Sequence, residues 1–580
     1  SGTVVSSTDN EPLIGATVKG VGTTALAVTD LDGNYTLDVP KAIKEVEISY
    51  IGFRTQKVPV KAGRADVHLR EDGNMIDELV VIGYGSVKKG DVTNAVAQVK
   101  GDDLADRPVS NIASALQGEL AGVDIQAQSG APGSSVQVTV RGATSINDEG
   151  NSNPLYVVDG VPMDENFDLQ QLNPQDIESI EVLKDASSSA IYGSRGANGV
   201  IIITQKKGAE DGKTTVTAGV NLSIATPEHY IPIMSPSQWI NWRMGANYQS
   251  YVDTYGAAGA QVGDSYLDQV IIARGGAGTS SVIDPRWAMP GYGGLSLVDW
   301  QKAMFRPSFS QTYNLAITQG TKKSNYRASV SYVNQDGIVI NTNFNRLTAK
   351  LSGRTMLGDK LQLGIDVAPQ MVVTKGGRVD GTDGTAKDAL SLVPVVENET
   401  GLNTSAEPYS RYIYAGSTVS PVSVMNERTY RDEQIRIQAS AFAKYTIMKG
   451  FDAEVLGSWI FNNRDIKRFT PSNVTRNWGQ GEGYAAEGMW TGNRSHKYLL
   501  QATATYDHTW AKVHHLNVVG GWSVESTQDA SSYTMNATQF PNNIIKGWTI
   551  NDVTPTGFTA TYTTDDHLIS YFARAEYGYD

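Results

Sequence analysis

Residues 155–208 read LYVVDGVPMDENFDLQQLNPQDIESIEVLKDASSSAIYGSRGANGVIIITQKKG, and this stretch decides the fold of the chain. Leu155–Val158 is a short apolar run, and the turn pair Asp159-Gly160 ends it. Ile177–Leu183 and Val200–Thr204 have the composition of two further strands. The last of these is apolar on both faces, so we expect it to be buried on both. Short buried strands joined by tight turns predict a compact wedge.

Two segments near these strands in the sequence are predicted to be helices. Asp185 is predicted to cap a short helix of small residues, Ala186–Tyr192, which Gly193 would end. Ser110–Leu120 is predicted to be a second helix, with Ser110 as its N-cap and its apolar residues on one face. Val136–Val140 alternates Val with Gln and Thr, which predicts a half-buried strand.

The same region closely resembles the plug domain of TonB-dependent outer-membrane transporters, in particular the SusC/RagA class. The resemblance rests on LYVVDGVP, on the run from Ile177 to Gly208, and on VTVRG at Val138–Gly142. It implies a plug at residues 91–208 inside an antiparallel transmembrane β-barrel of about twenty-two strands. We therefore expect an all-β membrane protein with an α+β plug in the Gram-negative outer membrane.

Composition is consistent with this class. The chain has 58 glycines, 27 tyrosines, no cysteine and a net charge of −13. No run approaches the ~18–20 consecutive apolar residues of a spanning helix, whereas barrel strands would not show in a hydropathy plot. The acidic balance argues against a nucleic-acid partner, and the missing thiols exclude cysteine chemistry.

Residues 1–70 form the first predicted unit. Short strand candidates recur at about 8–12-residue spacing, which indicates a small β-sandwich. The phrase from Glu11 to Val39 resembles the carboxypeptidase-regulatory-like domain found ahead of many SusC-type plugs. It carries no zinc-site spacing, and Asp30–Gly33 is better explained by a β-turn than by a calcium loop.

Residues 71–90 are predicted to be a linker with a functional strand. An acidic, β-prone run lies between flexible residues, so we expect its backbone to pair with an exposed sheet edge of another protein. In position and composition it resembles the TonB box, although an ordinary first plug strand is the alternative. The residues assigned to TonB binding are Asp77, Glu78, Leu79, Val80, Val81, Ile82, Gly83 and Tyr84.

In residues 214–580, apolar and polar side chains alternate with a period of two residues. Apolar side chains alternate with Gln, Thr, Ser, Asn, Arg and Gly in runs such as Val216–Ile224, Leu361–Val367 and Leu500–Tyr506. We predict roughly ten to fourteen strands of about ten residues each, the first part of a longer barrel. A soluble sandwich would show similar alternation, but aromatic residues near the strand ends favour lipid contact. Tight turns are expected at Gly320–Ser324 and Leu357–Lys360.

Long connections are expected on the other side of the barrel. They are predicted at Pro227–Trp300, Val373–Glu433 and Asn463–Ser495, with a short helix at Ser235–Met244. Their aromatic residues are weak candidates for stacking on sugar rings. These are Trp239, Trp242, Trp287, Tyr292, Trp478 and Trp490.

Two polar plug loops, residues 143–154 and 163–174, are the candidates for substrate contact, because in the family such loops face the cavity. Their candidate residues are Asn147, Asp148, Asn151, Asn153, Asp164, Glu165 and Asn166. No metal, cofactor or catalytic motif is recognisable, and the seven histidines are scattered, so an enzyme is not expected.

The resemblance implies TonB-dependent import. The implied partners are TonB, a SusD-like surface lipoprotein that closes over the barrel, membrane lipid, and an oligosaccharide or oligopeptide substrate. The resemblance also implies a dimer of transporter–lid pairs. The alternatives are an outer-membrane receptor or adhesin that does not transport, and a secreted multidomain β enzyme.

Overall fold

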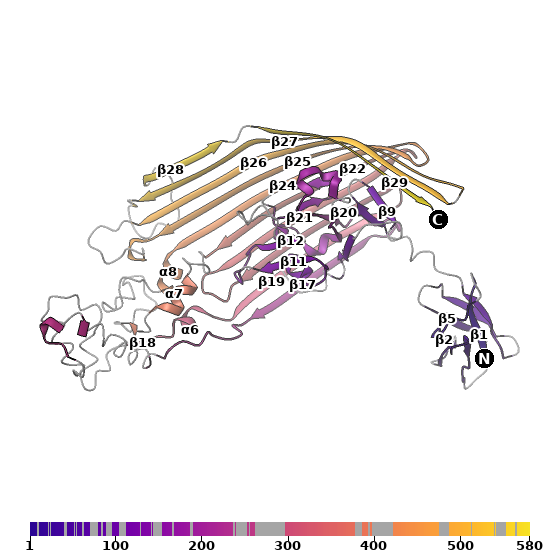
Figure 1. Ribbon diagram of the computed structural model, residues 1–580, viewed down its shortest axis with the longest axis horizontal. Helices are drawn as coiled ribbons and strands as arrows, with labels where there is room; N and C mark the ends of the chain where they lie inside the picture. The colour runs from indigo at the N-terminus through magenta and orange to yellow at the C-terminus, as the bar shows by residue number, and fades with distance from the viewer. Residues whose placement is uncertain are drawn as a thin grey trace. The chain divides into compact units, whose positions relative to one another are not determined.

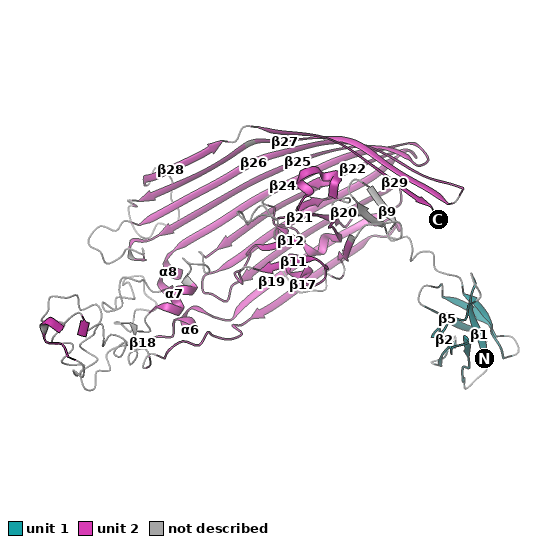
Figure 2. Ribbon diagram, in the orientation of Figure 1, with its two compact units in different colours: residues 1–95 teal, residues 96–580 magenta. Residues whose placement is uncertain are grey.

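The computed structural model divides the chain into two compact units, Ser1–Ala95 and Val96–Asp580 (Figure 2). The structure describes residues 1–580 except 8–10, 21–22, 24, 40–42, 44, 51–52, 54, 61–62, 70–78, 83–84, 89–95, 102, 104–111, 128, 141, 143–152, 165–166, 186–188, 236–237, 239–251, 254–255, 262–295, 377–384, 393–394, 397–420, 475–485, 512, 539, 541–552, 563–564 and 580.

The first unit is a small β-sandwich, as predicted. One sheet has the order β4-β1-β7 and the other β3-β2-β5-β6. The strands are β1 (Gly2–Ser6), β2 (Thr17–Gly20), β3 (Leu26–Val28), β4 (Asn34–Tyr35), β5 (Glu45–Ser49), β6 (Gln56–Pro59) and β7 (Val67–Leu69). Their inward side chains form one core that includes Val4, Val18, Ile48 and Leu69. Burial of this shared apolar surface holds the two sheets together.

The predicted turn in this unit is present. The Oδ1 of Asp30 accepts hydrogen bonds from the backbone N of Asp32 and of Asn34, at 3.1 and 2.8 Å. Gly33 has a φ of 73°, which a side chain would disfavour. The carboxylate of Asp30 therefore closes the turn itself, as an Asx-turn does.

A β-hairpin follows within the predicted linker. Strands β8 (Leu79–Ile82) and β9 (Gly85–Lys88) are antiparallel, with Leu79 opposite Lys88 and Ile82 opposite Gly85. The sequence predicts a strand without a partner in its own domain, and that expectation is wrong for one edge of β8. Its backbone is paired locally because β9 follows after a connection of only residues 83–84.

The plug contains a sheet of order β10-β15-β16-β13-β14. Its strands are β10 (Val96–Lys100), β13 (Leu155–Val158), β14 (Val161–Pro162), β15 (Ile177–Leu183) and β16 (Val200–Gln205). Val200 to Ile203 are buried, which confirms that β16 is covered on both faces. A second pair, β11 (Val123–Ala127) with β12 (Val136–Val140), packs in the same core.

The plug helices differ from the prediction. Helix α2 covers only Ile112–Leu116, and Ser110 lies outside the described residues. Instead of an α-helix ending at Tyr192, a 3-10 segment, η6, runs over Ala190–Gly196, while residues 186–188 are not described. Gly193 has a φ of 62° and a ψ of −147°, so it interrupts the segment rather than ending it.

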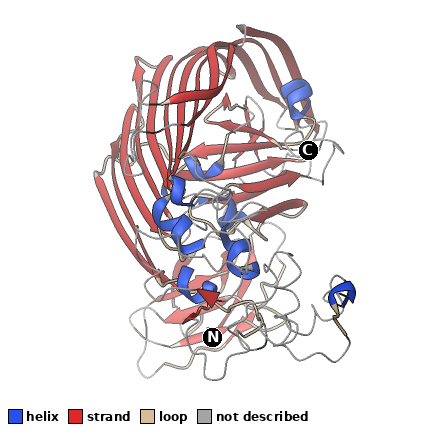
Figure 3. Ribbon diagram, turned by 90° about the vertical axis from the view of Figure 1, so that its left-hand side faces the viewer, coloured by secondary structure: helices blue, strands red, loops and turns tan. Residues whose placement is uncertain are grey.

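The rest of the second unit is a long antiparallel sheet, called the wall here (Figure 1). Its strands are β17 (Thr215–Ala225), β19 (Ser308–Gly320), β20 (Ser324–Asp336), β21 (Asn343–Leu357), β22 (Leu361–Lys375), β24 (Thr429–Met448), β25 (Phe451–Thr470), β26 (Glu487–Trp510), β27 (His514–Thr538), β28 (Thr554–Tyr562) and β29 (Asp566–Tyr579). Figure 3 shows that the sheet is curved.

Strands β28 and β29 both pair with β27 and run in the same direction along it. They are therefore consecutive parts of one interrupted strand. The predicted length of about ten residues is wrong for β24 to β27, which have 20 to 25 residues. The expected long loop at Asn463–Ser495 shrinks accordingly to residues 471–486, while the two predicted tight turns are present.

The outer face of the wall is apolar and has aromatic clusters at two levels. Across β25, β26, β27 and β29, one row consists of Val455, Ala502, Trp522 and Tyr571. One aromatic cluster contains Trp459, Phe461, His496 and Tyr498, and the other contains Tyr506, His508 and Trp510, with Tyr577 beside His514. An apolar band between aromatic belts is the surface that a bilayer requires.

Two long connections join into a small layer with its own core. Helices α6 (Trp300–Met304), α7 (Thr385–Ser391) and α8 (Pro421–Glu427) pack through Trp300, Met304, Ala389 and Met425. Strand β18 (Ser296–Leu297) pairs with β23 (Val395–Val396). The predicted helix at Ser235–Met244 lies almost wholly outside the described residues. None of the described helices is long and apolar enough to cross a membrane.

Candidate functional site at the plug and wall interface

Basic side chains on the inner face of the wall hold the plug. They come from four different strands and project from the face opposite to the apolar band. Each is almost completely buried and meets a plug carboxylate, amide, carbonyl or thioether. The five residues are Arg327, Arg346, Lys350, Arg436 and Lys497. A buried charge is costly unless it is paired, so these contacts define the plug position.

Arg327 of β20 contacts the short 3-10 segment η5 (Pro174–Asp176). Its Nη2 lies 2.8 Å from the Oδ1 of Asp176, and Asn173 donates to the other carboxylate oxygen at 2.9 Å. Asn173 also caps η5 by accepting from the backbone N of Gln175. The carboxylate is thus oriented by its own segment before it meets the wall.

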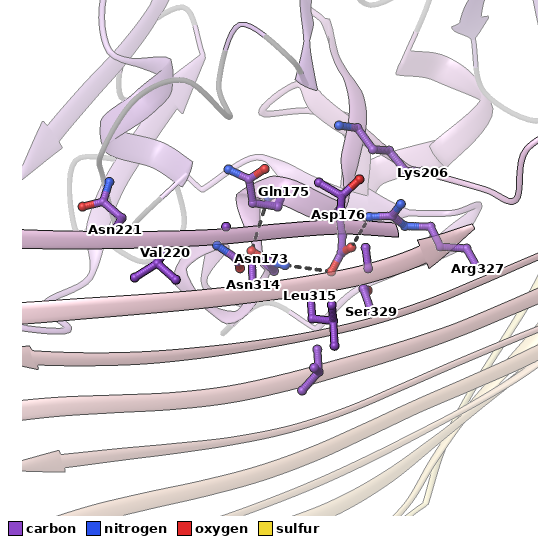
Figure 4. A pocket seen from close by; sticks show the side chains of 14 residues that line it. Asn173, Gln175, Asp176, Lys206, Val220, Asn221, Asn314, Leu315, Arg327 and Ser329 are labelled. Atoms are coloured by element: carbon purple, nitrogen blue, oxygen red, sulfur yellow. Dashed lines mark hydrogen bonds and ion pairs between the residues drawn. The ribbon is translucent and has the colours of Figure 1, made fainter. Parts of the chain in front are cut away.

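A polar cavity of about 270 Å³ adjoins this ion pair, between η5, Lys206 and strands β17, β19 and β20 (Figure 4). Three buried polar atoms beside it have no hydrogen-bond partner in the described part of the chain: Asn314 Oδ1, Arg327 Nε and Ser329 Oγ. Buried polar groups are normally paired with protein or water. The cavity therefore has the chemistry to take up water or hydroxyl groups.

Lys350 of β21 contacts the carboxyl ends of two neighbouring parallel plug strands, β13 and β16. Its Nζ lies 3.0 Å from the Oδ2 of Asp159 and 2.6 Å from the Oε1 of Gln205. Asp159 has a φ of 49°, and its other carboxylate oxygen accepts from the backbone N of Gln205 at 2.9 Å. The turn predicted at Asp159-Gly160 is therefore also an attachment point to the wall.

The segment η4 (Leu169–Gln171) is held from two strands. Arg436 of β24 donates to the Oε1 of Gln171 at 3.0 Å and to the sulfur of Met163, and it lies over the ring of Phe167 at 4.9 Å. Arg346 of β21 donates to the backbone carbonyl of Gln170. Both guanidinium groups use planar geometry to satisfy acceptors in a buried site.

Lys497 of β26 contacts the strand end and loop that follow β14. It donates to the carbonyl of Pro162 at 3.1 Å and lies 3.7 Å from Asp164 and 3.2 Å from Glu525 of β27. Glu525 in turn accepts two hydrogen bonds from Arg195 of η6, at 2.5 and 2.8 Å. At this place the wall supplies both a cation and an anion.

Polar side chains continue along the inner face beyond the plug contacts. Gln434 donates to Asn462 at 2.8 Å, and Arg464 forms a two-point ion pair with Asp432 at 2.9 and 2.6 Å. The Nε2 of Gln171 lies 3.5 Å from the Oε1 of Gln434, which joins this patch to η4. The patch offers amide, guanidinium and carboxylate groups, which suit hydroxyl-rich or amide-rich ligands.

Two plug carboxylates have raised pKa values. Burial raises the pKa of Asp168, although hydrogen bonds from Gln170 oppose this shift. Burial also raises the pKa of Glu181, whose Oε1 accepts from Gln98 of β10 at 3.2 Å. The other oxygen, Oε2, has no partner among the described residues. Glu181 therefore places an unsatisfied buried oxygen where β10 pairs with β15.

Most predicted substrate residues lie outside the described residues: Asn147, Asp148, Asn151, Glu165 and Asn166. Asn153 is exposed, and Asp164 is partly buried beside Lys497. Of the predicted TonB-binding residues, the backbone of Leu79–Ile82 forms β8, while Asp77, Glu78, Gly83 and Tyr84 are not described. The assignment of both sets remains a prediction.

Trp490 is not in a loop, contrary to the prediction. It lies in β26, and its ring contacts Tyr533 and the ammonium group of Lys467 at 3.9 Å. The other aromatic candidates, Trp239, Trp242, Trp287, Tyr292 and Trp478, lie outside the described residues. Among the described residues, no group of three or more His, Asp or Glu side chains is arranged to hold a metal ion.

The wall cations were not among the predicted site residues. A signal for them exists in the sequence, because Arg327, Arg346, Lys350, Arg436 and Lys497 stand on the polar face of strands that alternate with a period of two. A long basic side chain on the inner face of such a strand is expensive to bury without a partner. Such positions are therefore candidates for plug contacts.

Two parts of the chain match known protein families. Residues 88–200 match the family model described as the TonB-dependent Receptor Plug Domain, and residues 1–81 match the CarboxypepD_reg-like domain. The TonB-dependent receptor P3 of Formosa agariphila is 29% identical over 585 residues, covering 100% of this chain and 53% of the relative. The TonB-dependent receptor SusC of Bacteroides thetaiotaomicron is 35% identical over 355 residues, covering 60% of this chain and 31% of SusC.

The chain belongs to the SusC/RagA-like TonB-dependent receptors. The fold agrees with this conclusion: the structure of the RagAB peptide importer in the open-open state aligns with a TM-score of 0.66 at 22% identity. That alignment covers 87% of this chain and 55% of the other. The chain spans about half the length of the curated relatives it matches.

Membership in this family confirms several predictions. The wall is the outer-membrane β-barrel sheet of such a receptor, which agrees with its apolar outer face. TonB-dependent receptors are not enzymes, so the prediction that the chain has no catalytic activity is confirmed by the family. The plug and the N-terminal carboxypeptidase-regulatory-like domain are both present.

Proposed function

We propose that the protein carries out TonB-dependent import of oligosaccharides across the outer membrane, together with a SusD-like lipoprotein lid. The observation that carries this proposal is the chemistry of the plug and wall interface. The plug is fastened by Arg327, Lys350, Arg436 and Lys497 through polar contacts. Polar contacts can exchange with water and with hydroxyl groups, so an interface of this kind can be opened and closed again.

The site at which force is applied is proposed to be Asp77–Tyr84. Strand addition uses backbone N–H and C=O groups, and β8 presents these groups along Leu79–Ile82. Because β9 occupies one edge of β8, TonB would add to the other edge or replace β9. Tension on this segment then passes to β10, which is the edge strand of the plug sheet.

Val80 allows a direct test of strand addition. Val80→Pro removes a backbone donor from β8, whereas Val80→Ala keeps it. In cells that display equal amounts of the full-length receptor, uptake should be lost in the proline variant and retained in the alanine variant. Binding of substrate at the cell surface should persist in both. Undiminished uptake by the proline variant, or by a receptor that lacks Asp77–Tyr84, would contradict strand addition at this segment. Binding without any uptake by the parent protein would favour an adhesin or a receptor that does not transport.

The substrate class is proposed from chemistry and from relatives. Amide, guanidinium and carboxylate groups of Gln434, Asn462, Arg464 and Asp432 suit the hydroxyl groups of a glycan. The RagAB peptide importer shares the fold of this chain. An oligopeptide is the alternative, because the same groups also pair with peptide amides. Titration of the purified receptor with neutral oligosaccharides and with oligopeptides of matched length separates the two.

A lid partner is proposed to meet the loop layer of α6, α7 and α8. This layer has its own apolar core, and Asn341 joins it to the turn between β20 and β21 by donating to the carbonyl of Met425 at 3.1 Å. A rigid loop layer offers a defined surface to a second protein. Co-purification with a lipoprotein of the SusD-like class, and the number of copies in that complex, tests both the lid and the proposed dimer of transporter and lid pairs.

A further inference from the structure

Four charged side chains form an alternating row from one plug segment to another through the wall. Asp164, in the loop after β14, lies 3.7 Å from the Nζ of Lys497, and Lys497 lies 3.2 Å from Glu525. Glu525 then pairs with Arg195 of η6, with Nη2 2.5 Å from Oε1. Two plug segments that are separated by about thirty residues in sequence are thus linked through side chains of β26 and β27.

Burial is uneven along this row. The side chains of Lys497 and Glu525 are 11% and 7% exposed, whereas those of Asp164 and Arg195 are 34% and 31% exposed. The two inner charges therefore depend on their neighbours, and the two outer ones can exchange a neighbour for water or for a ligand. In a poorly solvated site, a change of charge at one end alters the pairing at the next position.

We propose that Lys497 and Glu525 couple the loop at residues 163–174 to η6, so that engagement of Asp164 loosens the Arg195 contact. When a ligand takes the Asp164 carboxylate, Lys497 keeps Glu525 as its remaining anion and draws closer to it. The ion pair between Glu525 and Arg195 then becomes weaker. This inference rests on the proposed function in one respect, namely that the ligand lies on the plug loops.

The position of η6 gives the coupling a consequence. It connects β15 to β16, which are neighbouring strands of the plug sheet. Arg327 and Lys350 fasten the plug to β20 and β21, whereas Arg195 fastens it to β27. Loosening Arg195 would free the plug on one side of the wall while the other side stays attached. A loaded plug would then need less force for its displacement.

Hydrogen exchange in the ligand-free, full-length receptor tests the coupling without knowledge of the substrate. Asp164→Asn removes the charge that a ligand would engage. Exchange in a peptide covering residues 190–199 should become about five- to tenfold faster. Asp168→Asn is the matched control in the same loop, because the carboxylate of Asp168 accepts from Gln170 and is outside the row. It should leave that peptide unchanged.

Lys497→Gln removes the link itself. In this background Asp164→Asn should have no further effect on residues 190–199, and Lys497→Arg should restore the response. The proposal is overturned if Asp164→Asn leaves the exchange of these residues unchanged, or if Asp164→Asn and Asp168→Asn accelerate it equally. If Lys497→Gln does not fold, Glu525→Gln serves the same purpose from the other strand. These outcomes do not depend on uptake, so failure of the proposed import would be seen separately.

Discussion

Arg327 of β20 and Asp176 of the plug form an ion pair that is buried on both sides. The Nη2 to Oδ1 distance is 2.8 Å, and the two side chains are 9% and 6% exposed. They are 151 residues apart in the sequence. Removal of one partner leaves the other as an uncompensated buried charge, which costs about 3–5 kcal/mol.

Asp176→Ala should therefore destabilise the attachment of the plug by about that amount, 3–5 kcal/mol. The double variant Asp176→Ala with Arg327→Met should recover part of the loss, because it buries no unpaired charge. Urea unfolding of the full-length receptor, followed by protease cleavage within the plug, measures both. A double variant as unstable as the single one would show that the pair has no role beyond packing.

Asp159 provides a second test, because its backbone and its charge can be separated. Asp159→Asn keeps a side chain that tolerates the observed φ of 49° and can still accept from Gln205, but it loses the charge that faces Lys350. We expect a loss of about 1–3 kcal/mol for Asn. For Ala we expect a further loss of about 1 kcal/mol, because it also disfavours the left-handed backbone. Equal urea midpoints for the two variants would contradict this division.

Much of the fold could be predicted because burial leaves a local pattern. Val200–Thr204 is apolar on both faces since both faces of β16 are covered, and most wall strands alternate since one face meets lipid. Strand β25 has a weaker alternation for a related reason. Its inner face carries Leu456 and Ile460, which pack into the plug core, so the polar half of the alternation is interrupted.

The site could be predicted much less well. Arg327 and Asp176, or Lys497 and Asp164, meet only after the wall has curved around the plug, and no local pattern records such a contact. The outer parts of β25 and β26 were also missed. Asp465 and Lys467 interrupt the apolar face there, because these strands continue beyond the apolar band. A strand with polar groups on both faces has the composition of a loop.

Leu500 tests the orientation of the wall. It is 47% exposed on the outer face of β26, between the two aromatic levels. Leu500→Arg should destabilise the receptor in lipid vesicles by about 2–4 kcal/mol, the cost of a cation near the bilayer midplane. Thr503→Arg is the matched control on the inner face of the same strand, where it lies opposite Glu454 at the level of the apolar band, and it should destabilise the receptor much less. The order of the two effects would be reversed if the polar face met lipid.

Glu181 makes the stability of the plug depend on pH. Its carboxyl is fully buried, and burial raises its pKa above the ordinary value of 4.5. The folded plug therefore holds a proton that the unfolded chain has already lost, so stability falls as pH rises from about 4.5 to the raised pKa and then stays low. Glu181→Gln cannot ionise and can still accept from Gln98. It should be more stable than the parent at pH 7 by about 1–3 kcal/mol, with the difference disappearing below about pH 4.5.

Glu181→Gln should slow the separation of β10 from β15, because Gln98 and Glu181 lie opposite each other on these two strands. Hydrogen exchange of residues 96–100 at pH 5 and pH 8 measures it. Glu178→Gln is the control, because Glu178 is exposed on the same strand, and its effect should be much smaller at both pH values. If Glu181→Gln exchanged as fast as the parent at pH 8, the buried carboxyl would not weaken the edge strand.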